Sequence, residues 1–440
     1  MNKVTIRISE ELCTRIRKDL SRPHAHAYER VGFLIGRSKT LPENEELICL
    51  TEYHPVEDDN YIKDDSVGAR INSNAIREAM QIVMTEKCCM FHVHMHFGHG
   101  TPEFSETDLT ELPGVAQAMI NANPNRTHGI LLLSENGADA LVKENNMPAK
   151  AVDKVVILGY PMTFNHSFYK DTHFSSTRYD RQSFLGEWAQ HKLSSVKIGV
   201  VGLGGGGSHI VQQLSHLGVL NFVIFDDDFV AESNLNRLVF ANLNDAETQI
   251  QKNLVFKRLI KGLHPEANIT LVNSKWQEEP ELLHSCDVIL GAVDSFSGRR
   301  DLELDSRRYL IPYIDIGMDV KIVDDNAPRL FGQVILSAPG NPCMKCIGFL
   351  NDEILTQEAN RYGDAGNKPQ VVWSNGVLAS NAVGLCVDLI TGWSGNIDPC
   401  IYQEYDGNNM SMTKTYRLDY LNRDACDHFP SNQCGPPIWK

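Results

Sequence analysis

The chain has 440 residues, of which 42% are hydrophobic and 22% charged, as is typical of a globular protein of two or three domains. Its 41 Lys and Arg against 56 Asp and Glu give a formal net charge of −15, which argues against nucleic acid as a partner because phosphate binding needs a basic surface. The sequence lacks a signal peptide, an apolar run of the roughly 18 residues that a membrane helix needs, and a disulfide framework among its eleven cysteines, so we expect a cytoplasmic protein without a membrane partner.

The first part of the chain alternates short strands and helices. Apolar and polar side chains alternate in the predicted strands, and an Asn-Gly turn predicts a hairpin near residue 136. The expected elements are strands at residues 4–8, 29–36, 89–94, 129–134 and 138–143 and helices at residues 9–20 and 75–87. We therefore predict an α/β domain at residues 1–160, followed by a connector at residues 161–180.

The rest of the chain, residues 181–440, opens with a predicted helix that leads to a buried strand at residues 196–202. A glycine-rich turn, Gly202-Leu-Gly-Gly-Gly-Gly207, follows this strand directly and precedes another helix. The next strand, residues 221–225, ends at Asp226. This order of strand, glycine turn, helix, strand and acid predicts a Rossmann-like domain.

A first set of polar residues suits a zinc site in the N-terminal domain. His92 and His94 stand at i and i+2 of one strand, so they share a face and can share a metal, with Asp108 from the next helix as third ligand. Glu29 is the candidate to take a proton from a water at the open position, and Ser105 can hydrogen-bond a tetrahedral intermediate. Plainer interpretations also exist, because His-x-His is common on solvated strands and Ser105-x-x-Asp108 is also a helix capping box.

The spacing of these residues resembles a known family. Glu-x-x-Gly-x-Leu-x-Gly from Glu29, with His-x-His-x(10)-Ser-x-x-Asp from His92, resembles the JAMM (JAB/MPN) metalloproteases over about residues 1–150. The resemblance implies a JAB/MPN-like α/β fold and cleavage of peptide or isopeptide bonds after the C-terminal glycine of ubiquitin-like proteins. It assigns catalytic zinc to His92, His94 and Asp108, the general base to Glu29 and the oxyanion contact to Ser105. Met95 replaces the family's proline, and an inactive JAMM fold is the alternative.

The glycine-rich turn belongs to a second set of residues. At the start of a helix its backbone N–H groups can approach a phosphate, but an NAD-dependent oxidoreductase would show the same turn and an acid at Asp226. The residues that follow favour nucleotidyl transfer instead. Arg237 and Lys252 are basic groups for a triphosphate, and Asp294, after a buried strand, is an acid for magnesium.

This region resembles the ThiF/MoeB/HesA family, the adenylation core of ubiquitin-activating enzymes, over about residues 175–440. The resemblance implies that Asp226 holds the ribose of ATP, that Asn234, Arg237 and Lys252 hold its phosphates, and that Asp294 positions Mg²⁺. It also implies that Gly202, Gly204, Gly205 and Gly207 form the phosphate loop. Lys257 competes with Lys252 for the lysine role, but the spacing to Pro265 favours Lys252. Arg181 matches an arginine that reaches the partner subunit's nucleotide, which implies a homodimer, although a surface arginine remains the alternative.

The cysteines separate into roles. Cys343 and Cys346, with Cys426 and Cys434, suit a structural Cys₄ zinc site, as the family implies. The second pair is more widely spaced than the family's Cys-x-x-Cys, and His428 is a possible substitute ligand. We interpret Cys286, Cys386 and Cys400 as structural. Between Cys346 and Cys386 the chain has no cysteine for a thioester, so we expect an external thiol-bearing protein to receive the adenylate.

The two resemblances together predict a bifunctional enzyme for a ubiquitin-like or sulfur-carrier protein that ends in glycine. The zinc peptidase would trim or release this protein, and the adenylyltransferase would activate its C-terminal carboxylate with ATP. Bacterial ubiquitin-like conjugation, including phage defence, and sulfur transfer both fit. Two alternatives stay open: a JAMM domain that serves only as a docking module, and adenylation of a peptide.

Overall fold

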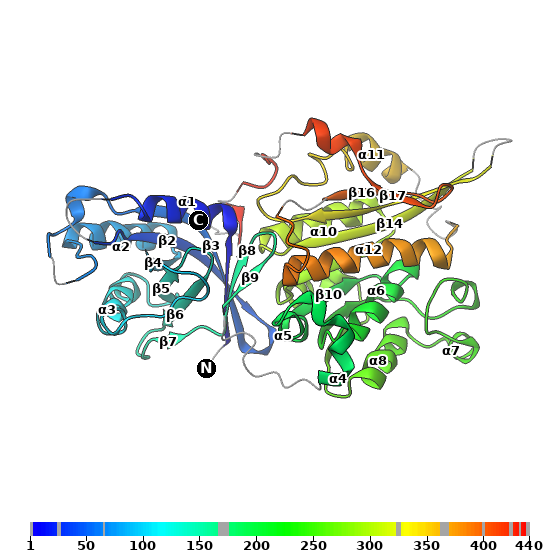
Figure 1. Cartoon of the computed structure of the whole chain (residues 1–440), viewed down its shortest axis with the longest axis horizontal. Coiled ribbons are helices and arrows are strands. Elements are labelled where there is room, and N and C mark those ends of the chain that lie inside the picture. The colour runs from blue at the N-terminus through cyan, green and yellow to red at the C-terminus, as the bar shows by residue number, and fades with distance from the viewer. Residues whose placement is uncertain are drawn as a thin grey trace. The chain divides into compact units, whose positions relative to one another are not determined.

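The computed structural model describes residues 3–23, 28–64, 67–165, 176–322, 327–360, 369–397, 401–421, 426–430 and 433–436. The chain divides into two compact units (Figure 1). Unit 1 comprises residues 1–170, 308–310 and 429–440, and unit 2 comprises residues 171–307 and 311–428. Of the predicted connector, residues 166–175 lie outside the described ranges.

Unit 1 is built on a mixed sheet, whose described strands follow the order β7-β6-β5-β4-β2-β3-β1-β8-β9. β1 is parallel to β3 and β8, and β4 is parallel to β5. β5 and β6 form the predicted antiparallel hairpin, whereas β3 is not among the predicted elements. The strands are β1 Lys3–Ser9, β2 Gly32–Leu41, β3 Glu45–Pro55, β4 Cys89–Met95, β5 His128–Leu133, β6 Ala138–Lys143, β7 Lys150–Ala151, β8 Lys154–Leu158 and β9 Thr163–Phe164.

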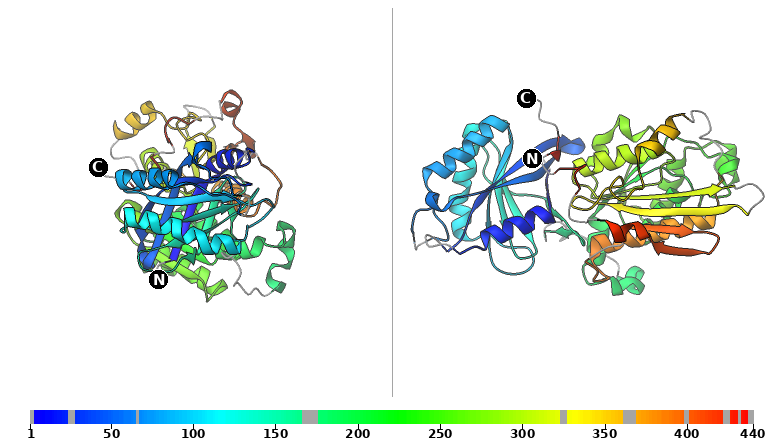
Figure 2. Two further views of the ribbon diagram at one scale, coloured as in Figure 1. Left: turned by 90° about the vertical axis from the view of Figure 1, so that its left-hand side faces the viewer. Right: turned by 90° about the horizontal axis from the view of Figure 1, so that it is seen from above.

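Helices cover both faces of this sheet: α1 (Glu10–Leu20) covers one, and α2 (Ser73–Glu86) and α3 (Glu106–Ala122) cover the other (Figure 2). α1 begins where predicted, because the Ser9 hydroxyl accepts a hydrogen bond from the Leu12 N–H at 3.2 Å. The apolar side chains of α1 pack against β1 and β8 in one core cluster. β4 is buried on both faces, because its alternate side chains belong to the two core clusters on opposite sides of the sheet.

Unit 2 is built on a second sheet, whose described strands follow the order β12-β11-β10-β13-β14-β15-β16-β17. The strands from β12 to β14 are parallel, and those from β14 to β17 are antiparallel. Their bounds are β10 Lys197–Val201, β11 Asn221–Phe225, β12 Asn268–Val272, β13 Val288–Gly291, β14 Tyr313–Lys321, β15 Arg329–Ser337, β16 Tyr402–Asp406 and β17 Ser411–Lys414.

The parallel part of this sheet confirms the predicted Rossmann-like fold. From β10 the chain moves outward through β11 to β12 and then returns to β13 on the other side of β10. Ligands of such sheets bind at the carboxyl ends of the strands where the order reverses. The glycine turn after β10 and the loop after β13 meet at this point.

The helices of unit 2 also lie on both faces of their sheet. Asp315 of β14 contacts Arg299 of α10, whereas the next residue, Ile316, lies against Gly206 of α6. Neighbouring side chains of a strand point to opposite faces, so α10 and α6 cover opposite faces. The helices are α4 Ser176–Tyr179, α5 Ala189–Ser195, α6 Gly205–His216, α7 Leu243–Glu247, α8 Lys252–Leu263, α9 Pro280–His284, α10 Phe296–Arg308, α11 Asp352–Asn360 and α12 Val372–Thr391.

The helix predicted from Arg181 is wrong in detail. The segment forms a 3₁₀ helix, Asp180–Leu185, and then the separate helix α5. Gly186 lies between them with φ +108°, which interrupts the helical backbone. Among the described helices of the whole chain, none is long and apolar enough to span a bilayer.

The burial of β13 gives a stability prediction for unit 2. Leu290 is fully buried in β13, whereas Leu304 on α10 is 53% exposed. We expect Leu290→Ala to lower the free energy of unfolding by about 3 kcal/mol, because it leaves a cavity. Leu304→Ala should change it by less than about 0.5 kcal/mol. A urea titration followed by tryptophan fluorescence, to which the buried Trp276 contributes, measures both; equal midpoints for the two variants would contradict the packing described above.

Candidate functional site

The glycine turn leaves bare backbone at the N-terminus of α6. Gly202 has φ +89°, and a Cβ there would lie 2.8 Å from the Ala292 carbonyl oxygen. A Cβ on Gly207 would collide with the Gly202 carbonyl. The turn therefore accepts no side chains at these two positions, and the N–H groups of the first turn of α6 are left for a ligand, as a phosphate cradle requires.

Asp226 fixes this turn to the end of β11. One carboxylate oxygen accepts the Leu203 N–H at 2.6 Å, and the other accepts the Asp228 N–H at 3.1 Å. Burial raises the pKa of Asp226, and the Lys252 ammonium, 3.7 Å away, partly offsets this effect. Lys252 also pairs with Asp228 at 2.5 Å. The structure thus brings three of the predicted parts together, namely the glycine turn, the ribose acid and the phosphate lysine.

Asn234 and Arg237 lie on the loop that follows Asp228. The Asn234 side chain accepts the Ala231 N–H at 3.2 Å, and Arg237 donates to the Ser233 carbonyl at 2.8 Å. These bonds are local, and neither residue is among the described residues that line the cavity next to the glycine turn. Arg181 is exposed. The phosphate contacts expected of all three remain predictions.

A cavity of 1240 Å³ opens beside the glycine turn within unit 2. Gly204 and Asp294 lie in its wall, together with residues of β14, β15, β16 and the first turns of α12. The cavity is too large for a nucleotide's phosphates alone, and antiparallel strands form its far part. This far part was not predicted, because no sequence motif marks β14 to β17.

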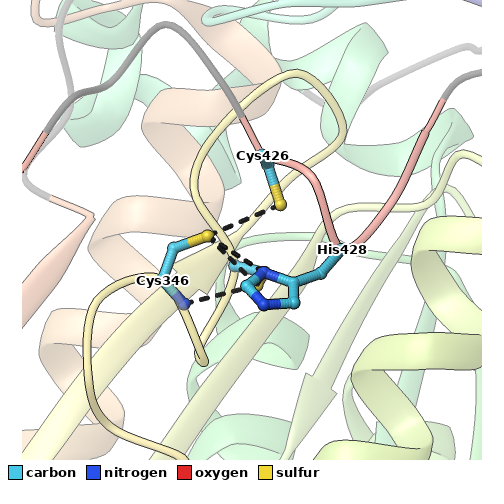
Figure 3. Close-up of side chains that lie close together, drawn as sticks. Cys346, Cys426 and His428 are labelled. Carbon is cyan, nitrogen blue, oxygen red and sulfur yellow. Dashed lines mark hydrogen bonds between the residues drawn. The ribbon is translucent and has the colours of Figure 1, made fainter.

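Three thiols and one imidazole, of Cys343, Cys346, Cys426 and His428, converge in unit 2. Figure 3 shows how Cys346, Cys426 and His428 point toward one another. Cys346 Sγ lies 3.7 Å from Cys426 Sγ and 3.3 Å from His428 Nδ1, and Cys343 Sγ lies 3.6 Å from Cys346 Sγ and 3.5 Å from His428 Nδ1. Zinc–sulfur bonds of about 2.3 Å in a tetrahedron place the donors about 3.8 Å apart. The donor set and its spacing therefore fit structural zinc.

The fourth donor of this group differs from the expected Cys₄ set. His428, named only as a substitute ligand, joins Cys343, Cys346 and Cys426, whereas Cys434 is outside the group and belongs to unit 1. His428 follows Cys426 by two residues, which lets both reach one ion, whereas Cys434 follows by eight. The wide spacing of the two cysteines was the available signal for this substitution.

A second group of metal-type donors stands at the end of β4 in unit 1. His94, His96 and Asp108 each place a ligand atom within 4.8 Å of the others. His94 Nε2 lies 3.2 Å from Asp108 Oδ1, and His96 Nε2 lies 3.4 Å from Asp108 Oδ2. Zinc bonds of about 2.1 Å set nitrogen and oxygen donors about 3.4 Å apart. The Nδ1 of His94 is buried without a hydrogen-bond partner among the described residues, and its Nε2 faces the Asp108 carboxylate.

His92 was expected in this triad, but the structure groups His96 there instead. The ring of His92 lies beside that of His94, with centroids 5.6 Å apart, and edge-on to Phe33. Burial lowers the pKa of His92 to about 3, so its ring is neutral. The sequence contains two overlapping His-x-His pairs, and only the second, His94-Met-His96, reaches Asp108 with both rings.

Ser105 and Asp108 form the capping box of α3 at the same time. The Ser105 hydroxyl and N–H both donate to Asp108 Oδ2 at 2.8 Å, and the Asp108 N–H donates back to the hydroxyl at 3.2 Å. Partial burial raises the pKa of Asp108, but His94 and these bonds outweigh it and hold the pKa well below its usual range. Capping and ligation are therefore compatible here.

Glu29 lies in the loop before β2 and packs on Gly68. Its N–H donates to the Gly68 carbonyl at 2.9 Å, and a Cβ on Gly68 would lie 2.6 Å from the Glu29 carboxylate. The carboxylate is thus held over bare backbone. Its role as general base remains a prediction.

The cysteines interpreted above as structural belong to unit 2. Cys386 is fully buried in α12, and burial raises its pKa to about 12. Cys286 is also fully buried, and Cys400 lies outside the described residues. A buried thiol of high pKa is a poor nucleophile, which agrees with the structural interpretation of Cys386, and the full burial of Cys286 agrees with the same interpretation.

The two candidate fourth ligands of the thiol group can be separated by mutation. We expect His428→Ala to lower the zinc content of the purified protein by about one ion per chain, because it removes a donor from a four-coordinate site. Cys434→Ser, the control, should leave the zinc content unchanged. Atomic emission on protein purified without added metal measures both; loss of zinc in Cys434→Ser alone would restore the Cys₄ set.

Comparison with known proteins identifies the family to which unit 2 is similar. The model of the ThiF family matches residues 178–427, more than half of the chain. The SAMP-activating enzyme E1 of Haloferax volcanii is 28% identical over 175 residues, which are 39% of this chain and 61% of that protein. The molybdopterin-synthase adenylyltransferase of Haemophilus influenzae is 32% identical over 184 residues, which are 38% of this chain and 75% of that protein.

A solved structure is also similar. The crystal structure of E. coli MccB with AMPCPP and MccA covers 56% of this chain and 72% of that one, at 20% identity and a TM-score of 0.44. The family match, by contrast, spans the glycine turn, Asp226, Lys252, Asp294 and three of the four donors of the thiol group. The chain belongs to the ThiF family.

Proposed function

We propose that unit 2 uses ATP to adenylate the C-terminal carboxylate of a ubiquitin-like or sulfur-carrier protein. One observation carries the proposal: the glycine turn and Asp294 share a cavity of 1240 Å³ that continues past the nucleotide loop along β14 to β16. An extended tail that ends in glycine would fit such a continuation without a side chain at the reacting end. Membership of the ThiF family and the adenylyltransferase names of its relatives support the proposal.

The chemistry follows from these positions. An oxygen of the carboxylate attacks the α-phosphorus of ATP, the bond to the bridging oxygen breaks, and pyrophosphate leaves with the electron pair. The protein supplies no nucleophile, so catalysis consists of positioning and charge neutralisation. The N–H groups of α6, Lys252 and Arg237 would neutralise the phosphate charge, and Asp226 would hold the ribose. Asp294 would hold Mg²⁺, which supplies further positive charge to the phosphates when bound.

The product and the assembly complete the proposal. No described cysteine near the cavity is exposed and free of the thiol group, so the acyl-adenylate would pass to a thiol on another protein. Arg181, which is exposed, would reach the nucleotide of a second copy in a homodimer. The zinc of the thiol group would be structural, since Cys343, Cys346, Cys426 and His428 fill all four positions.

Pyrophosphate exchange tests the adenylation. With a glycine-terminated ubiquitin-like protein encoded beside the gene, we expect ATP–pyrophosphate exchange that Asp294→Ala and Lys252→Ala each lower by about 100-fold, because each removes charge stabilisation at the phosphates. Lys257→Ala is the matched control on the same helix and should retain activity. Exchange with a short peptide but with no ubiquitin-like protein would favour the peptide alternative, and exchange with neither would refute the proposal.

We further propose that unit 1 is a JAMM-type zinc peptidase that cleaves after the terminal glycine of the same protein. His94, His96 and Asp108 would hold the metal, and the close spacing of their ligand atoms supports this. Zinc bound there would polarise the scissile carbonyl and make a bound water acidic. Glu29 would accept the proton of that water and deliver it to the leaving amine, and Ser105 would donate a hydrogen bond to the oxyanion.

Variants that distinguish the two overlapping His-x-His pairs test the peptidase proposal. On a precursor with residues after the glycine, we expect His96→Ala and Glu29→Gln each to lower kcat/KM by more than about 100-fold, through loss of the metal and of the base respectively. His99→Ala, at an exposed histidine paired with Glu135, is the control. Zinc content should fall in His96→Ala and stay in Glu29→Gln. Zinc loss in His92→Ala but not in His96→Ala would return His92 to the triad, and unchanged processing in every variant would leave unit 1 as a docking module.

A further inference from the structure

Arg299 is a buried cation in the wall of the cavity. Its guanidinium donates to the Val293 carbonyl at 2.8 Å and to the Ile316 carbonyl at 3.3 Å, and its Nε pairs with the Asp315 carboxylate at 3.1 Å. The Val293 carbonyl belongs to the peptide bond that leads into Asp294. One face of the loop before Asp294 is therefore bonded to β14 through a single side chain.

The charge of Arg299 is already matched. Asp315 is fully buried and also accepts the Tyr313 hydroxyl at 2.7 Å and the Gln333 amide at 3.3 Å. Gly317, on the same strand, leaves the space for the guanidinium, because a Cβ there would collide with it. The donors of Arg299 are therefore occupied by protein partners and are not available to an incoming phosphate. Its role is to hold the surrounding backbone in place.

Glu358 of α11 secures the other side of the same loop. Its two carboxylate oxygens accept the N–H groups of Phe296 at 2.7 Å and Ser297 at 2.8 Å, the first two residues of α10. The Ser295 hydroxyl accepts the third N–H, that of Gly298, at 3.0 Å. A carboxylate at a helix N-terminus also interacts favourably with the helix dipole. The start of α10 is therefore fixed two residues after Asp294.

We infer that Arg299 and Glu358 are positioning residues that hold Asp294 in the geometry needed for adenylyl transfer. This role rests on the adenylation proposed above. The two residues come from different helices, and neither is a nucleotide ligand. Asp294 is bracketed: the carbonyl before it is bonded to Arg299, and the N–H groups after it are bonded to Glu358. Because Glu358 lies on α11, adenylation also requires α11 to be docked on α10.

The side chains around the bracket give matched controls. Arg300, the next residue, pairs with its neighbour Asp301 and is half exposed. Glu353 is exposed on the same helix as Glu358. In pyrophosphate exchange we expect Arg299→Lys and Glu358→Gln each to lower kcat by about tenfold or more, with less than about twofold change in KM for ATP, because the ligand contacts stay and the alignment is lost. Arg300→Lys and Glu353→Gln should match the wild type.

A double-mutant cycle with Asp294→Asn separates positioning from general destabilisation. If both residues act through Asp294, Arg299→Lys and Glu358→Gln should change the residual exchange of Asp294→Asn by less than about twofold. Losses that multiply in that background, or single variants that equal their controls, would overturn the inference while the adenylation stands. Absence of exchange in the wild type would instead refute the adenylation and the inference together. Glu358→Asp, which keeps the charge, should restore part of the activity lost in Glu358→Gln.

Discussion

The pairing of buried charges along α10 is the constraint on which unit 2 depends. Arg299, Glu303 and Arg307 lie one helical turn apart and are all buried. An unpaired buried charge costs several kcal/mol, so each must meet a fixed partner. Arg307 donates to two carbonyls and Glu303 accepts one N–H in the loop on either side of Cys343, much as Arg299 secures the loop before Asp294. One helix thus organises the cavity at one end and the thiol group at the other.

Much of the fold followed from local sequence pattern, whereas the walls of the cavity did not. The strand before Gly202, the bare turn and the acid at Asp226 form a short local unit, and its geometry is set by steric limits on the backbone. Nothing in the sequence marks the charged residues of α10 as buried. Only the tertiary fold, which brings Asp315 to Arg299, makes them interior.

The metal groups show where spacing alone is ambiguous. Two overlapping His-x-His pairs are equivalent on paper, and the end of β4 at Met95 decides between them, because His96 lies just beyond the strand and turns toward Asp108. A capping box and a metal ligand were rival interpretations of Asp108. The two roles are compatible, since Oδ1 faces His94 while Oδ2 accepts the bonds of Ser105. The two interpretations would exclude each other only if Asp108 made a single contact, but its carboxylate has two oxygens.

The thiol group has a consequence for chain entropy. Cys346 and Cys426 are 80 residues apart in the chain, and the segment between them contains α11, α12, β16 and β17. An ion shared by these thiols is a removable crosslink that closes a long loop in the unfolded chain. A covalent crosslink of such a loop is worth about 4.5 kcal/mol. Oxidation of these thiols, or removal of the ion by a chelator, would therefore loosen the part of the sheet that walls the cavity. The thiol group would act on the cavity without contacting the nucleotide.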